Sequence, residues 1–184
     1  MLKHLKFDVQ EFPPSYSFPQ IREQIARMGR LLGREERADA LVQELDTQLA
    51  DAIGSRAKTN LLAALHYANS YTAGGGTLAG EVLKAAGLEN LGERMGLSGT
   101  VKLPLEVLVM MRPDMVIGGQ RPGNAPALAY ETFQHPALRA VLQNADMTAV
   151  PDKYWVCGAP FTAEAVRILS EKAAALVGER RGAP

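Results

Sequence analysis

Tyr71–Leu91 reads YTAGGGTLAGEVLKAAGLENL and places three consecutive glycines directly before a helical pattern. Thr77 is a residue type that caps helix N-termini. The apolar residues that follow it recur at helical spacing until Gly87, where the helix is expected to end. Such a glycine loop suits three structures, namely a phosphate-binding loop, a plain tight turn, or the floor of some other binding site.

The phosphate-binding interpretation has weak support from the surrounding residues. No lysine followed by serine or threonine comes after the glycines, so the P-loop pattern is absent. The variant G-x-G-x-x-A does fit from Gly74 to Ala79, but such a site needs an acidic residue at the end of a second strand. The candidates Glu89 and Glu93 lie in what the sequence predicts as loop or helix. A nucleotide-binding α/β enzyme domain that uses Gly74–Gly76 is therefore the alternative function.

Apolar periodicity, prolines and glycines predict strands and helices on both sides of this segment. In chain order, the predicted elements are a strand over His4–Phe12, helices over Ser17–Gly33 and Glu35–Ile53, a strand over Thr59–Tyr67, the helix after Thr77, a short helix from Pro104, a strand over Asp114–Gly119, one or two helical segments over Pro126–Val141, a strand over Asp146–Pro151 and a terminal helix over Thr162–Gly178.

From Thr59 onward, short apolar strands alternate with helices, which predicts an α/β fold with a mainly parallel sheet. The strand over His4–Phe12 does not fit this pattern, because two long helices separate it from the next strand. We interpret it as the remnant of a different sheet.

The composition indicates one soluble globular domain, since 47% of the 184 residues are hydrophobic and 22% are charged. The chain has 20 lysine and arginine residues and 20 aspartate and glutamate residues. It therefore has no strong positive electrostatic potential that would attract nucleic acid. No apolar run is long enough to span a bilayer, and the N-terminal residues lack the apolar stretch of an export signal.

Catalytic and metal-binding patterns are weak. His4, His66 and His135 do not pair with one another or with cysteine and carboxylates at metal-ligand spacing, and His66 is expected to be a core residue. There is no G-x-S-x-G motif. The single cysteine, Cys157, has no identifiable base nearby and is expected to be buried or half-buried and inert. The sequence thus predicts no enzyme, no metal site and no cofactor.

Aromatic residues cluster where a ligand would bind. Tyr67, Tyr71, Tyr154 and Trp155 lie at or just past the ends of predicted strands. In open α/β sheets, ligands bind outside the carboxyl ends of the strands. The cluster suits the walls of a ligand site, and ordinary core packing is equally compatible with it.

Several segments together resemble a known family. NSYTAGGGTLAGEVLKAAGLENLGERMGLSGTVKLPLEVLVMMRPDMVIGG, APALAYETFQHPALRAV and VPDKYWVCGAP resemble the C-terminal part of substrate-binding proteins of ABC importers. The subgroup takes up iron-siderophores, haem and cobalamin. IREQIARMGRLLGREERADALVQELDTQL is similar to the helical segment that joins the two lobes in that family.

The resemblance implies a three-layer, Rossmann-like lobe with a mainly parallel sheet, preceded by long bridging helices. Residues 1–16 would be a remnant strand of a missing N-terminal lobe, residues 17–56 the bridging helices, and residues 57–184 the C-terminal α/β lobe. The chain would then be a fragment of a periplasmic protein, and half a cleft should bind ligand weakly because one wall rarely offsets the cost of association.

The family holds its ligand in the cleft between the lobes and delivers it to the permease subunits. The resemblance implies an iron-siderophore, haem or cobalamin as ligand, that is, a metal chelate or corrinoid. The residues expected on the cleft wall are Tyr71, Gly74, Gly75, Tyr154, Trp155 and Arg121. Aromatic walls suit large planar ligands, and glycines would let the backbone approach the ligand closely.

The resemblance also assigns a docking residue. Family members carry an acidic residue on each lobe that contacts arginines of the permease, and Glu106 in LPLEVLVMMRPD is at the matching position. A carboxylate favoured by the dipole at a helix start is the other explanation of Glu106. Without a second lobe, the exposed interlobe face would favour a dimer or a swapped arrangement.

Overall fold

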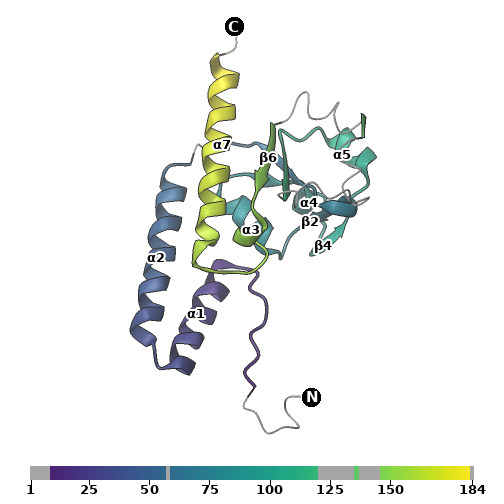
Figure 1. The fold of residues 1–184 in the computed structure, drawn as a ribbon. Coiled ribbons are helices and arrows are strands. Elements are labelled where there is room, and N and C mark those ends of the chain that lie inside the picture. The colour runs from purple at the N-terminus through teal and green to yellow at the C-terminus, as the bar shows by residue number, and fades with distance from the viewer. Residues whose placement is uncertain (1–8, 57–58, 120–134, 137–145, 183–184) are drawn as a thin grey trace.

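Figure 1 shows a sheet with helices on both faces and a helical hairpin beside them, in a computed structural model of the chain. Residues 9–56, 59–119, 135–136 and 146–182 are described. Arg121 lies outside these ranges, as do the helical segments predicted over 126–141 except for His135 and Pro136. No helix among the described residues is both long and apolar enough to cross a membrane.

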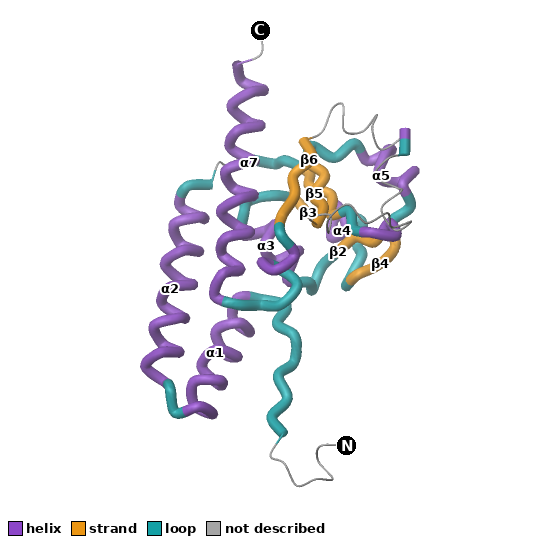
Figure 2. The backbone as a smooth tube through the Cα atoms, in the orientation of Figure 1, coloured by secondary structure: helices purple, strands orange, loops and turns teal. Residues whose placement is uncertain are grey.

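The helical hairpin consists of α1 (Phe18–Leu32) and α2 (Glu35–Gly54). The hydroxyl of Ser17 accepts a hydrogen bond from the amide of Gln20, and Gly33 ends α1 in the left-handed conformation at φ 60°. Both helices were predicted from the sequence, and their bounds agree within one or two residues. α2 packs along α7 (Ala163–Gly182), as Figures 1 and 2 show, so the hairpin is joined to the α/β body.

A four-stranded sheet lies at the centre of the body. Its order is β3-β1-β5-β6, and every neighbouring pair is parallel. The strands are β1 (Leu62–Leu65), β3 (Glu89–Asn90), β5 (Met115–Gly119) and β6 (Asp146–Val150). The predicted parallel sheet is confirmed, but the expectation of loop or helix at Glu89 is wrong. Strand β3 is too short to show alternation and is formed by its pairing with Leu62 and Ala63.

The two faces of the sheet contribute to two separate apolar cores. Ala63 and Leu65 belong to the larger core, which they share with α1, α2, α7 and α3 (Leu78–Ala85). Leu62 and Ala64 belong to a smaller core with α4 (Leu91–Arg94) and α5 (Leu105–Met111). All four residues of β1 are buried, because successive side chains point to opposite covered faces. The expected three-layer arrangement is therefore present.

A second, smaller sheet was not predicted. β2 (Tyr71–Ala73) pairs antiparallel with β4 (Thr100–Lys102). The glycine segment connects β2 to α3. Thr77 caps the first turn of α3, since the Thr77 hydroxyl accepts a hydrogen bond from the amide of Gly80 at 3.0 Å. The strand-to-helix turn was predicted, but the preceding strand is part of this ribbon and not of the central sheet.

The strand predicted over His4–Phe12 is not formed in its described part. Val9–Phe12 have no strand pairing, and the residues before Val9 lie outside the described ranges. The alternation of this segment is weak, and a strand also needs a neighbouring strand to accept its backbone hydrogen bonds. The division of the chain at residues 16 and 56 stays a prediction.

Asp114 connects the start of β1 with the terminal helix. Its Oδ2 accepts a hydrogen bond from the amide of Leu62 at 2.7 Å, and its Oδ1 lies 2.6 Å from Nη2 of Arg180.

We expect Asp114→Ala to lower the free energy of unfolding by about 2 kcal/mol, because the amide of the buried Leu62 loses its acceptor. Arg180→Ala should cost less than about 1 kcal/mol, because the Arg180 side chain is 50% exposed. Urea denaturation measures both values, and equal losses would contradict this difference.

Candidate functional site

The glycine loop is hydrogen-bonded to a second loop. The amide of Gly74 donates to the carbonyl of Gly99, and that of Gly75 donates to the carbonyl of Leu97, each at 2.9 Å. The hydroxyl of Thr77 donates to the carbonyl of Gly74 at 2.8 Å. A phosphate site needs free amides that point at the anion. The amides of Gly74 and Gly75 are already used, which disfavours the nucleotide-binding alternative.

Gly74 is required by internal packing. A Cβ atom at this position would overlap the carbonyl oxygen of Leu97 and lie 2.6 Å from its carbonyl carbon. A Cβ atom at Gly75 would have no neighbour closer than 3.8 Å, which is ordinary contact. The close approach to Leu97 by itself requires glycine at position 74, whether or not a ligand also lies there. Contact of Gly74 and Gly75 with a ligand stays a prediction.

A cavity of about 410 Å³ lies beside this loop. Its walls come from the residues that follow β1 and β6, from the β2–β4 ribbon, from the start of α3 and from the extended segment before α1. Open parallel sheets bind ligands beyond the carboxyl ends of their strands. We call this hollow the cleft cavity, and its lining residues are Pro14, Ser15, Tyr16, Tyr67, Ala68, Tyr71, Ala73, Thr77, Leu78, Ala79, Thr100, Asp152, Trp155 and Val156.

Four aromatic residues line the cleft cavity, namely Tyr16, Tyr67, Tyr71 and Trp155. The rings of Tyr67 and Trp155 meet edge to face with centroids 6.3 Å apart. Trp155 is 4% exposed, and its indole nitrogen has no hydrogen-bond partner among the described residues. Tyr71 is 37% exposed, with Nζ of Lys102 5.9 Å from its ring centroid. The structure therefore brings two of the expected site residues, Tyr71 and Trp155, to one cavity.

The other expected aromatic residue, Tyr154, is placed differently. Its ring packs against Phe161 at a centroid distance of 6.1 Å, and Nζ of Lys153 lies 4.9 Å from the Tyr154 centroid. Tyr154 does not line the cleft cavity. Tyr154 ends the short 3₁₀ turn Asp152–Tyr154, and Trp155 is its C-cap. The two side chains point in different directions, so the sequence alone could not tell which of them lines the cavity.

Tyr67, which belongs to the aromatic cluster predicted for a ligand wall, also lines the cleft cavity, as does Asp152, which was not predicted. Burial raises the pKa of the Tyr67 phenol, and the nearby Asp152 carboxylate raises it further. The phenol is therefore neutral at physiological pH and can donate a hydrogen bond. His66, directly before it, is fully buried as expected, and burial lowers the pKa of its imidazole.

Glu106 lies in the first turn of α5 and is exposed. Met110, one turn later on the same helix face, is 73% exposed, whereas Leu108 between them is fully buried. The structure thus leaves a carboxylate and an apolar side chain next to each other on the outer surface of α5.

A second hollow, of about 570 Å³, is a groove between the helical hairpin and the loop after Trp155. Cys157, the one cysteine of the chain, is exposed and lines this groove. The expectation that Cys157 is buried or half-buried is therefore wrong.

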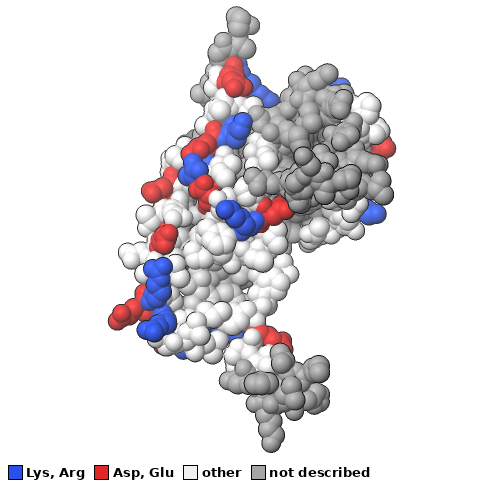
Figure 3. Space-filling model, in the orientation of Figure 1, with Lys and Arg blue, Asp and Glu red and all other residues white. Residues whose placement is uncertain are grey.

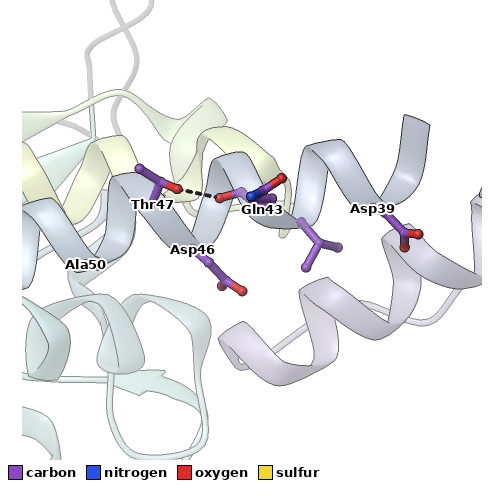
Figure 4. Close-up of a pocket in the computed structure, with 6 residues that line it drawn as sticks. Asp39, Gln43, Asp46, Thr47 and Ala50 are labelled. Carbon is purple, nitrogen blue, oxygen red and sulfur yellow. Dashed lines mark hydrogen bonds between the residues drawn. The ribbon is translucent and has the colours of Figure 1, made fainter. Parts of the chain in front are cut away.

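A third hollow lies beside α2 and, unlike the cleft cavity, has no aromatic residue in its lining. Its lining residues all come from α2, and Figure 4 shows them along one side of that helix. The hydroxyl of Thr47 donates to the carbonyl of Gln43, and Asp46 pairs with Arg22 at 2.6 Å, so these polar groups already have partners. Within the described part of the chain, no three side chains of histidine, cysteine, aspartate or glutamate converge on a possible metal position.

Sequence comparison identifies relatives of known type. The sequence profile of the family described as "Periplasmic binding protein" matches residues 4–150. Cobalamin-binding proteins of two strains of Halobacterium salinarum are each 29% identical over 122 residues, which cover 64% of this chain and 33% of theirs. The chain therefore spans about one third of the length of these curated relatives.

Solved structures with the same fold are also longer than this chain. The periplasmic haem-binding protein HutB of Vibrio cholerae matches with a TM-score of 0.77 at 16% identity, covering 95% of this chain and 70% of HutB. An ABC-type Fe³⁺-hydroxamate transport protein of Saccharomonospora viridis matches with a TM-score of 0.70 at 23% identity, covering 90% and 57%. At these identities the likeness shows the Rossmann-like fold alone. The family profile matches residues 4–150, and the fold agrees with that match. The chain therefore belongs to the periplasmic binding protein family.

Proposed function

We propose that this chain is part of the substrate-binding component of an ABC importer, and that it forms one wall of a site for an iron-siderophore, haem or cobalamin. The observation that carries the proposal is the cleft cavity, where Trp155, which follows the parallel strand β6, and Tyr71, the first residue of β2, line one hollow in a member of a binding-protein family. The similarity to cobalamin-binding and haem-binding proteins supports this ligand class.

The chemistry of the cleft cavity fits a large, partly planar metal chelate. Aromatic rings offer apolar faces to a corrin, a porphyrin or a catecholate. The neutral Tyr67 phenol and the indole nitrogen of Trp155 offer hydrogen-bond donors, and the Asp152 carboxylate offers an acceptor. The protein binds and releases its ligand without changing it, so we propose no enzymatic activity and no resident cofactor.

The location and the partners follow from the same proposal. We propose that the protein acts in the periplasm and passes its ligand to permease subunits, with Glu106 as a contact for permease arginines. Nucleic acid is not proposed as a partner, because the formal net charge is zero. The dimer expected from the sequence stays a prediction.

Fluorescence of Trp155 tests the proposed ligand class, because it is the one tryptophan of the chain and lies in the cleft cavity. Haem, cyanocobalamin and ferric siderophores would be titrated into the protein. Free N-acetyltryptophanamide controls for absorption by the ligands. Saturable quenching by one of them is expected. Absence of saturable quenching with all three classes would contradict the proposal.

Tyr71→Ala should weaken ligand binding by roughly tenfold, because one aromatic contact contributes about 1 kcal/mol beyond its buried area. The matched control is Tyr154→Ala, since Tyr154 is a neighbouring tyrosine whose ring packs on Phe161 outside the cavity. The control should change the dissociation constant by less than about twofold. Both constants are measured by the same quenching titration. A larger effect at Tyr154 would show that the ligand sits elsewhere.

A further inference from the structure

The cleft cavity has one charged side chain among the described residues that line it, the carboxylate of Asp152. Burial and then this carboxylate raise the pKa of the Tyr67 phenol, which therefore stays neutral at physiological pH. The wall of the cavity is thus negative at one place and uncharged elsewhere. Its neutral polar groups are the indole of Trp155 and the hydroxyls of Ser15, Tyr16, Tyr67, Tyr71, Thr77 and Thr100.

No described lysine or arginine neutralises Asp152. It is exposed and opens the 3₁₀ turn Asp152–Tyr154 after β6. Within the described part of the chain, its carboxylate takes part in no ion pair. The neighbouring Lys153 has its Nζ 4.9 Å from the ring centroid of Tyr154, and neither of these two residues lines the cavity. The negative charge is therefore available to a ligand that enters the cavity.

The charged groups around the cavity leave Asp152 as its main charge. Nζ of Lys102 lies 5.9 Å from the ring centroid of Tyr71, but Lys102 is exposed and does not line the cavity. Solvent and salt screen such an exposed cation. The formal net charge is zero, and Figure 3 shows acidic and basic side chains interspersed along α2 and α7. The charge that a bound ligand meets is therefore set locally.

A ligand that fills the cavity would remove water from Asp152. A carboxylate that loses water without gaining a hydrogen-bond donor is unfavourable, and one that faces another anion is more unfavourable still. The N–H donors of amide or ammonium groups offset this loss, because hydrogen bonds to a charged acceptor are stronger than those between neutral groups. The side of the ligand that faces Asp152 should therefore carry such donors and no anion.

We infer that the cleft cavity takes a neutral or cationic metal chelate, which presents amide or ammonium N–H donors to Asp152. The inference rests on the proposed function and narrows its ligand class. Amide-rich corrinoids and neutral ferric hydroxamates have this chemistry, whereas haem carries two carboxylates and ferric catecholates are anionic. Asp152 is then a specificity residue, which disfavours anionic chelates as much as it favours neutral ones.

Four probes test the inference in the protein, with quenching of Trp155 fluorescence as the readout. Cyanocobalamin and ferrichrome are the neutral corrinoid and hydroxamate, and haem and ferric enterobactin are the anionic probes. One of the neutral probes is expected to bind at least about tenfold tighter than both anionic probes, because like charges repel across the contact. Which neutral probe binds tighter distinguishes a corrinoid from a hydroxamate.

Asp152→Asn removes the charge and keeps the size of the side chain. It should raise the affinity for haem and ferric enterobactin at least about threefold and lower that for the preferred neutral probe about threefold. The thermal midpoint should not change, since Asp152 is exposed. Asp51→Asn is the matched control, because Asp51 is an exposed aspartate of α2 that does not line the cavity. It should change each dissociation constant by less than about twofold.

Salt provides a second measurement without a substitution. Raising the ionic strength from about 0.05 M to about 0.5 M should strengthen haem binding, because it screens the repulsion by Asp152, and should leave cyanocobalamin binding unchanged. Tighter binding of an anionic probe than of both neutral ones, haem binding that weakens with salt, or an unaltered preference in Asp152→Asn would overturn the inference and leave the proposed function standing. Absence of saturable quenching with all four probes would contradict the proposed function, and the inference with it.

Discussion

Gly74→Ala is expected to lower the free energy of unfolding by about 3 kcal/mol, the largest effect on stability among the substitutions considered. The added Cβ would overlap the carbonyl oxygen of Leu97, which is backbone and is itself held by the amide of Gly75. Because neither loop can move without breaking hydrogen bonds, the strain falls at the high end of overpacking in protein interiors. For a chain of this size the thermal midpoint should fall by roughly 6–12 °C.

Gly75→Ala is the control for this prediction. The two glycines are adjacent, but a Cβ at Gly75 has its nearest neighbour, Cγ of Glu93, at 3.8 Å. Neither glycine needs a positive φ, whereas Gly76 adopts φ 71° and is a poor control. Gly75→Ala should therefore change the free energy of unfolding by less than about 0.5 kcal/mol. Thermal and urea denaturation measure both variants, and similar losses would show that the loops are not packed as described.

Glu106→Lys is expected to reduce uptake of the ligand at least about tenfold, while ligand affinity stays unchanged. This prediction rests on the proposed permease contact. Like charges placed opposite one another across an interface cost several kcal/mol, so a lysine facing permease arginines should prevent docking. Uptake is measured in cells that carry the permease and the ATPase, and affinity is measured by quenching of Trp155 fluorescence.

Glu36→Lys separates docking from a local effect on the helix. Glu36 is also an exposed acid in the first turn of a helix, α2, so both substitutions lose the same favourable interaction with the helix dipole. Only Glu106 lies on α5 beside the exposed Met110. Equal losses of uptake in both variants, or a loss of ligand affinity in Glu106→Lys, would contradict the proposed role of Glu106.

Helices and turns could be predicted because their signals lie within a few residues of each other. The cap at Thr77, the left-handed Gly33 and the proline in the first turn of α1 act on neighbouring backbone groups. β1 and β5 were recognised as apolar runs, because both of their faces are buried. Strands β2, β3 and β4 have only two or three residues and were missed, because their stability comes from partners distant in sequence.

The candidate site was predicted only in part. Tyr67, Tyr71 and Trp155 were predicted for a ligand wall because aromatic residues after strands suit one, and all three line the cleft cavity. Their contact with a ligand stays a prediction. Asp152 was not predicted, and Tyr154 lies outside the cavity, because the direction of each side chain depends on packing against distant residues. Arg121 lies outside the described residues and stays a prediction.

The sequence by itself determined the α/β class, the helical hairpin and the family, because periodicity, caps and motif order are properties of the linear chain. Only the tertiary structure decided why Gly74 is glycine, which aromatic residues share a cavity, and that Cys157 faces an open groove. The physical reason is that each of these features depends on contact between segments far apart in the chain. Gly74 meets Leu97, Tyr67 meets Trp155, and the segment before α1 meets the loop that carries Cys157.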